Sequence, residues 1–137
     1  MGDVIVNLRL SSNDDQFAKV QTTLLKKHLV HNQNIEKVDQ EFEELKEYES
    51  GGSWLEILNV SVINSGVIIA LIRMIHAWLA NKKEAIKNSN KELSIIITVP
   101  NGKKIEIHSN NMEDLNKLTE EIQRILNDSK DGKVETK

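Results

Sequence analysis

The chain has 137 residues, of which 18 are Lys or Arg and 21 are Asp or Glu, so its net charge near neutral pH is -3. This length is typical of one domain, and a charge so close to zero disfavours nucleic acid as a partner. The absence of cysteine excludes disulfides and thiolate metal sites. Because 39% of the residues are hydrophobic and only 4% are aromatic, we expect a core built from Ile, Leu and Val.

The first segment alternates between apolar and polar residues, which predicts a strand over residues 3–10. Ser12 then caps a helix whose first turn holds Asp14 and Asp15, where carboxylates favour the positive helix N-terminus. Apolar residues at helical spacing continue this helix to about His31. The start of the chain does not have the pattern of a secretory signal, so we expect a cytoplasmic protein, with membrane association as an alternative.

Residues 35–48 fit two structures. Ile35, Val38, Phe42 and Leu45 follow the spacing of a helical stripe, whereas the acidic residues between them are typical of an edge strand that charge keeps soluble. The periodicity favours a helix. The Gly and Ser residues at 50–53 then predict a flexible joint.

A largely apolar run occupies residues 54–80. Asn64 and Ser65 interrupt it and suit the N-cap of a helix. The run therefore predicts a short helix followed by a longer one that ends near Lys87, and together they form one apolar helical segment over residues 54–87.

The last third of the chain predicts a hairpin and a closing helix. Residues 93–99 and 103–108 read as strands, and Asn101-Gly102 between them is the strongest short hairpin signal. Asn111 caps an amphipathic helix to about residue 126, and residues 128–137 are expected to be a disordered polar tail. The order of elements predicts a single α+β domain over residues 1–127, in which the N-terminal strand and the hairpin form a small sheet with helices on one face.

The apolar run itself has two interpretations. It is long enough to span a membrane between Trp54 and Trp78, and two basic residues follow it. Its polar interruptions favour instead core helices or a helix in an oligomer interface, since buried helices commonly contain runs of this length. The residues that would face a partner or a membrane are Trp54, Leu58, Ile68, Leu71, Ile72, Ile75, Trp78 and Leu79.

Three polar residues lie within the run. Arg73 and His76 are three positions apart and could pair with Glu56 across the bend between the two helices, or line a polar path in an assembly. The pairing is favoured, because buried charges normally have a nearby partner.

The sequence carries none of the motifs of dinucleotide binding, phosphate loops, hydrolase nucleophiles or zinc proteases. His28 and His31 could share a face of the first helix as metal ligands, but no carboxylate lies at matching spacing to complete a site. We therefore expect no enzyme activity, no cofactor and no metal.

Three stretches together resemble the effector-associated constant component family of bacterial conflict (anti-phage immunity) systems. They are VIVNLRL near the start, GGSWLEILNVSVINSGVIIALIRMIHAWLANKK in the middle, and LSIIITVPNGKKIEIHSNNMEDLNKL. In that family the apolar segment ends in a W-L plus a basic pair, which is similar to Trp78-Leu79 with Lys82-Lys83. A hairpin of the form V-x-V-x-x-P-x-G-x-x-I-x-I and a helix follow, as at residues 97–107 and 112–126.

The resemblance implies a non-enzymatic accessory or adaptor protein that partners a caspase-like or trypsin-like peptidase in prokaryotic immunity. Self-association through the apolar helices into a homo-oligomer is expected with it. The alternative is a membrane-disrupting effector that inserts residues 54–80 after activation by a protease.

Overall fold

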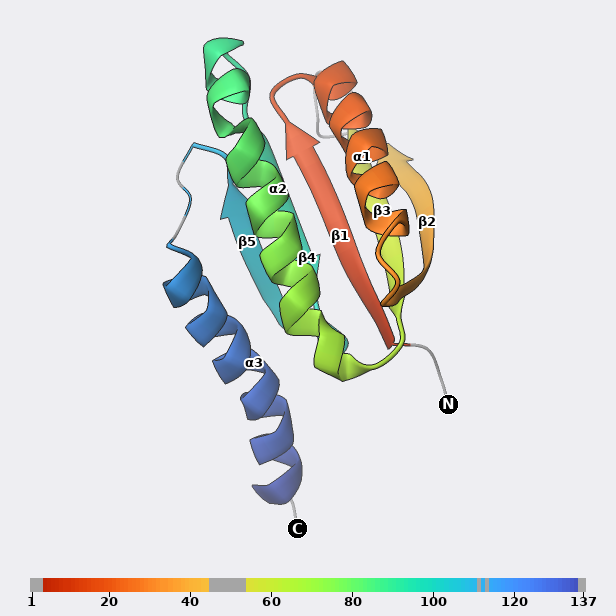
Figure 1. Cartoon of the computed structure of the whole chain (residues 1–137), viewed down its shortest axis with the longest axis vertical. Coiled ribbons are helices and arrows are strands. Elements are labelled where there is room, and N and C mark those ends of the chain that lie inside the picture. Colours follow the sequence, from red (N-terminus) through yellow and green to blue (C-terminus); the bar gives the residue numbers. More distant parts are fainter. Residues whose placement is uncertain (1–3, 45–53, 111, 113, 136–137) are drawn as a thin grey trace.

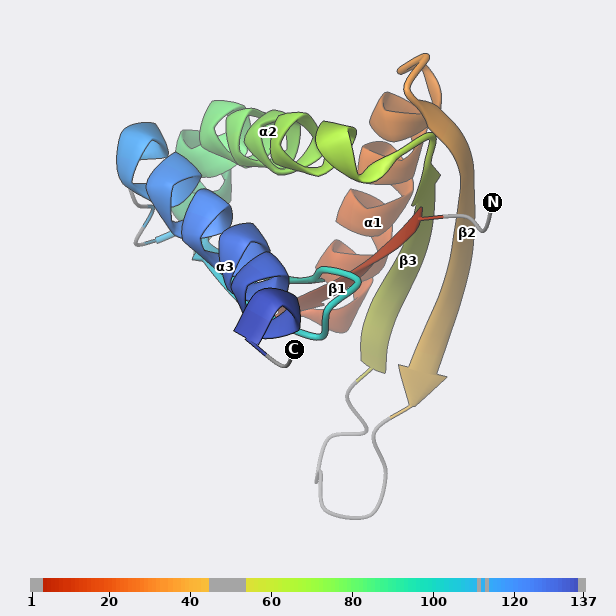
Figure 2. The ribbon, with the colours of Figure 1, turned by 90° about the horizontal axis from the view of Figure 1, so that it is seen from below.

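The computed structural model describes residues 4–44, 54–110, 112 and 114–135. Its five strands form one antiparallel sheet in the order β2-β3-β1-β4-β5, and its helices cover one face of that sheet (Figures 1 and 2). This arrangement confirms the α+β class. The elements are β1 (Val4–Ser12), α1 (Asp15–Val30), β2 (Ile35–Glu44), β3 (Trp54–Val62), the 3-10 helix η1 (Ser65–Val67), α2 (Ile68–Asn88), β4 (Leu93–Thr98), β5 (Lys104–His108) and α3 (Leu115–Glu135).

The first strand lies at the centre of the sheet, as its alternating pattern allows. Leu8 of β1 is fully buried and pairs with Leu58 of β3 on one side and with Ile97 of β4 on the other. The pairing of β1 with β4 confirms the expectation that the N-terminal strand lies beside the hairpin. The helix-facing positions of these three strands form the floor of the core, which consists of Val6, Leu8, Leu10, Leu58, Val60, Val62, Leu93, Ile95 and Ile97.

Residues 35–44 are an edge strand, which was the second of the two structures that the sequence fitted, so the preference for a helix there was wrong. A β-bulge between Ile35 and Lys37 explains the error. Because of the bulge, Ile35 pairs with Val62 and Val38 pairs with Val60, so two apolar residues three positions apart reach the same face of the sheet. That spacing imitates a helical stripe. Leu45 and the predicted joint at 50–53 lie outside the described residues.

The first part of the apolar run is also a strand and not a short helix. In β3, Leu58, Val60 and Val62 face the helices, while Ile57 and Ser61, which point to the other face, are also nearly buried. A strand with little exposure on either face reads as a continuous apolar run, which periodicity alone cannot distinguish from a helix. The predicted apolar helical segment over 54–87 is therefore a strand over Trp54–Val62 and helical only from Ser65 onward.

The second part of the run forms α2, as predicted. Asn64 accepts a hydrogen bond from the backbone of Gly66 and begins η1, which leads directly into α2. The end at Asn88 is close to the predicted end. Seven residues of α2 are buried and hold it on the sheet: Ile68, Leu71, Ile72, Ile75, Trp78, Leu79 and Ile86.

The N-cap of α1 is Asp14 and not Ser12. The Asp14 carboxylate accepts a hydrogen bond from the backbone N–H of Phe17 at 3.0 Å, and Lys91 Nζ lies 3.0 Å from its other oxygen. The Phe17 hydrogen bond, with help from Lys91, holds the pKa of Asp14 below its ordinary value. Ser12 Oγ accepts from the Asp14 N–H instead. This cap thereby joins the start of α1 to the segment before β4.

The C-terminal hairpin follows the prediction closely, whereas the closing helix is longer than predicted. The β4–β5 hairpin turns at Gly102, whose φ of 91° lies in the left-handed region. Helix α3 packs on α2 and buries Leu118 and Ile122 in the core. It continues to Glu135, past the end expected near residue 126 and into the segment predicted to be disordered.

Candidate functional site

Seven of the eight predicted partner-facing or membrane-facing residues lie in the core. In α2, Ile68, Leu71, Ile72, Ile75 and Leu79 are at most 3% exposed, and Trp78 is 7% exposed. Leu58 of β3 is fully buried, and Trp54 is the first residue of that strand. The buried side chains among them would contact a partner or a membrane only if α2 and β3 detached from the rest of the domain.

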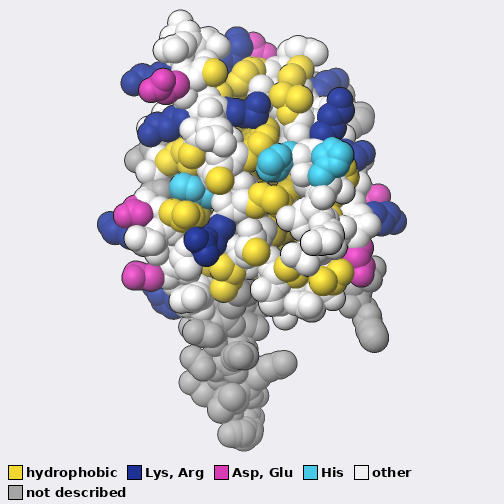
Figure 3. Space-filling model, viewed as in Figure 1, with side chains coloured by type: hydrophobic (Ala, Val, Ile, Leu, Met, Phe, Trp, Pro, Cys, Tyr) yellow, Lys and Arg dark blue, Asp and Glu magenta, His cyan; other side chains and the backbone are white. Residues whose placement is uncertain are grey.

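Hydrophobic side chains visible on the helix side of the molecule lie between lysine, arginine and histidine side chains (Figure 3). Among the described residues, no helix is both long enough and apolar enough to cross a bilayer.

The three polar residues of the run are not brought together. Glu56 is 2% exposed, opposite Leu10 in the sheet, and its Oε2 has no hydrogen-bond partner within the described part of the chain. Arg73 is exposed on α2. His76 lines a groove beside β5, which β1 and β4 separate from the strand that carries Glu56.

The face of the sheet that the helices leave open carries a chain of hydrogen bonds across three strands. Arg9 Nε donates to Asn7 Oδ1 at 3.3 Å, and Asn7 Nδ2 donates to Asn59 Oδ1 at 2.8 Å. Asn59 Nδ2 in turn donates to Glu41 Oε2 at 2.6 Å on β2. We call these four residues the polar strip. Its side chains are held in place before any partner arrives.

A second hydrogen-bonded group lies at the other end of the open face. Ser94 Oγ is 2.8 Å from His108 Nδ1, and His108 Nε2 is 3.2 Å from Glu106 Oε1. The order of groups is that of a hydrolase triad, but β4 is paired with β1 on one side and β5 on the other. The backbone N–H groups beside Ser94 are therefore engaged in the sheet and are not directed at an oxyanion. The group fixes side chains on the open face.

Sequence reasoning missed this group, because Ser94 and His108 are far apart in the sequence. The hairpin register, which pairs Ser94 with His108, was the signal that could have found it.

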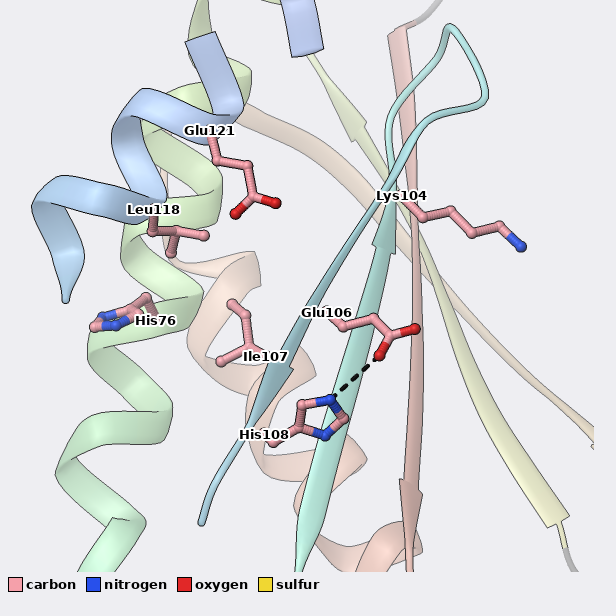
Figure 4. A pocket seen from close by; sticks show the side chains of 7 residues that line it. All are labelled: His76, Lys104, Glu106, Ile107, His108, Leu118 and Glu121. Carbon is pink, nitrogen blue, oxygen red and sulfur yellow. Dashed lines mark hydrogen bonds and ion pairs between the residues drawn. The ribbon is translucent and has the colours of Figure 1, made fainter. Parts of the chain in front are cut away.

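A groove of about 420 Å³ runs beside β5, between that strand and the helices (Figure 4). Ile107 of β5 and Leu118 of α3 point into the space between strand and helices, whereas Glu106 and His108 point to the other side of the strand. The residues that line the groove are His76, Lys104, Glu106, Ile107, His108, Leu118 and Glu121.

The described residues contain no group of three or more His, Asp or Glu side chains that could hold a metal ion. His28 lies in α1 and His31 is its C-cap residue.

A family model described as Effector Associated Constant Component 1 matches residues 13–126. No curated protein and no solved structure matches the chain.

Proposed function

Since that match covers most of the chain, the protein belongs to the Effector Associated Constant Component 1 family, and we propose that it is the non-enzymatic partner of an effector peptidase. The family is an effector-associated component of conflict systems. The resemblance noted from the sequence points to a caspase-like or trypsin-like peptidase as the effector. In this proposal the α+β body supplies a docking surface, and the chemistry belongs to the partner.

The observation that supports this proposal is the open face of the sheet with its polar strip. Hydrogen bonds already order Asn7 and Asn59 there, so a partner that binds them loses less side-chain entropy than it would on a mobile surface. Ile5 and Ile63 are 47% and 48% exposed and add apolar area. A surface with ordered polar groups and a few apolar side chains suits a folded protein partner.

Self-association through the apolar helices, which the sequence suggested, remains a proposal. It would cost free energy, because the apolar side chains of α2 are already buried in the core. Leu71 and Ile75 are packed on the sheet, so a dimer through that face of α2 requires the core to open. The membrane-disrupting alternative also requires the core to open, and it requires strand pairings to break as well. Strand β3 lies between β1 and β2, and release of residues 54–80 would break both pairings.

Coexpression with a caspase-like or trypsin-like peptidase whose gene lies beside the gene for this protein tests the proposal. We expect the two proteins to copurify through affinity and size-exclusion steps. Thr98 lies on the open face of β4, and Thr98→Arg should abolish copurification while the thermal unfolding curve stays cooperative.

Thr23→Arg is the matched control, because Thr23 is exposed on α1, on the opposite side of the sheet. It should copurify as the wild type does. If no adjacent peptidase copurifies with the wild type, the function is wrong. If Thr98→Arg copurifies normally, the open face is not the docking surface.

A further inference from the structure

Strand β5 is the last strand of the sheet, and its outer edge presents main-chain groups. The Val99 N–H donates to the Lys103 carbonyl at 3.0 Å, and the Ser109 N–H donates to the Leu93 carbonyl at 2.9 Å. Because bonding direction alternates along an antiparallel strand, the odd-numbered residues of this strand bond to β4. The N–H and C=O groups of the even-numbered residues therefore point away from the sheet: Lys104, Glu106 and His108.

The groove described above lies along this edge. Asn101 in the hairpin turn donates through Nδ2 to the carbonyl of Ile125 in α3 at 3.2 Å, and Leu118 anchors the helix in the core. These contacts fix the separation between α3 and β5. The volume of about 420 Å³ is within the range of protein ligand sites, which is about 300–1,000 Å³.

The opposite edge of the sheet differs. There β2 carries exposed charges at Lys37, Asp39 and Glu41, and the bulge at its start distorts the edge. Charged side chains and bulges are common means by which edge strands avoid pairing with another chain. Strand β5 also carries exposed charges, at Lys104 and Glu106, but its register with β4 has no bulge and a groove lies beside it, so this edge is the better suited of the two to an added strand.

We propose that the β5 groove binds an extended segment of the effector partner as a sixth strand of the sheet, a mode in which main-chain hydrogen bonds give affinity and side-chain pockets give specificity. This inference rests on the proposed function only for the origin of the segment. Residues directly opposite each other in adjacent strands share a face. Alternate residues of the segment therefore lie beside Lys104, Glu106 and His108, and the residues between them face Ile107 and Leu118.

Charge and polarity then define the segment. A basic residue belongs opposite Glu106, and an acidic residue belongs opposite Lys104. Apolar residues belong at the two positions beside Ile107 and Leu118, where His76 and Glu121 also line the helix side of the groove. In the antiparallel direction this gives the order polar, apolar, basic, apolar, acidic.

The probe is an acetylated and amidated peptide, Thr-Ile-Lys-Ile-Glu, added to the full chain. At saturation we expect amide hydrogen exchange of residues 104, 106 and 108 to slow at least about tenfold, whereas residues 105 and 107, already bonded to β4, keep their rates. The charge-reversed peptide, Thr-Ile-Glu-Ile-Lys, should bind about fivefold more weakly, because both cross-strand charge pairs become repulsive.

N-methylation of the peptide supplies a matched pair that leaves the protein unchanged. A methyl group on the backbone nitrogen of the peptide Lys removes a donor that points at β5 and should weaken binding at least about tenfold. The same methyl group on the following Ile nitrogen points away from the sheet and should leave affinity within about twofold.

The inference is overturned if the three amides keep their rates with saturating peptide, or if both methylated peptides bind alike. It is also overturned if those amides are protected in the free protein in a concentration-dependent way, since a second copy of this chain then fills the groove. The peptide measurements need no effector. If the peptide does not bind while copurification persists, only this inference fails. If the peptide binds while copurification fails, only the proposed function fails.

Discussion

The buried carboxylate of Glu56 gives the sharpest test of the core. It lies on the helix-facing side of β3, beside the buried side chains of Leu10 and Leu58, and its Oε2 has no hydrogen-bond partner among the residues that the structure describes. A buried polar atom without a partner costs stability, because it gives up hydrogen bonds to water and gains none. We therefore expect Glu56→Met, which keeps the length of the side chain and removes its polar atoms, to stabilise the protein.

The expected magnitude follows from that cost. An unsatisfied buried group costs about 1–3 kcal/mol, and a methionine at a site that is 2% exposed adds apolar burial. A gain of about 2 kcal/mol in the free energy of unfolding should raise the thermal midpoint by roughly 8 °C for a chain of this size. Glu106→Met is the control, because the Glu106 side chain is 57% exposed, and it should change stability by less than about 0.5 kcal/mol.

Guanidinium chloride unfolding, followed by circular dichroism, measures both variants. The midpoint of Glu56→Met should move to higher denaturant concentration at an unchanged slope. A loss of about 1 kcal/mol or more in this variant would refute the reasoning, because it would mean that the carboxylate has a stabilising partner within the fold.

Three further outcomes are expected. Ile75→Ala should lower the free energy of unfolding by about 2–4 kcal/mol, whereas Ile5→Ala on the open face should lower it by less than about 1 kcal/mol; a change in oligomeric state without a loss of stability at Ile75 would instead mean that α2 is an interface. Asp14 has a lowered pKa in the fold, so its contribution to stability is present at neutral pH and is lost as the pH falls from its ordinary pKa of 3.8 through the lower folded value. The thermal midpoint of the wild type should therefore fall more between pH 7 and pH 3 than that of Asp14→Asn, and equal falls would contradict the role of this charge. Gly102→Ala should cost about 1 kcal/mol in denaturant unfolding through backbone strain alone, since no atom lies within 4 Å of the added methyl group; an unchanged midpoint would contradict the left-handed turn.

Local patterns predicted most of the helices and three of the five strands. The alternation in β1, the Asn-Gly turn before β5 and the apolar stripe of α2 each depend on neighbouring residues, and the structure confirms all three. β2 and β3 were missed for different physical reasons. In β2 a bulge placed Ile35 and Val38 on one face, and in β3 Ile57 is nearly buried although it points away from the helices.

The candidate surfaces could not be predicted in the same way, because they depend on register and on packing between distant elements. The polar strip requires Asn7 and Asn59 to be opposite each other, which follows only from the pairing of β1 with β3. The β5 groove requires α3 to lean on α2 and leave the edge of β5 open. Neither relation has a signature in a single stretch of sequence.

The fold also constrains what the apolar run at residues 54–80 is able to do. Seven side chains of α2 are buried, and exposing an apolar side chain of this size costs roughly 1.5–3 kcal/mol, so detaching α2 alone costs on the order of 10–20 kcal/mol. The stability of a domain is only about 5–15 kcal/mol. Release of this helix is therefore equivalent to unfolding the whole body and is not a local hinge movement. A partner that binds the folded protein meets instead the surfaces that the core leaves outside, which are the open face of the sheet and the edge of β5.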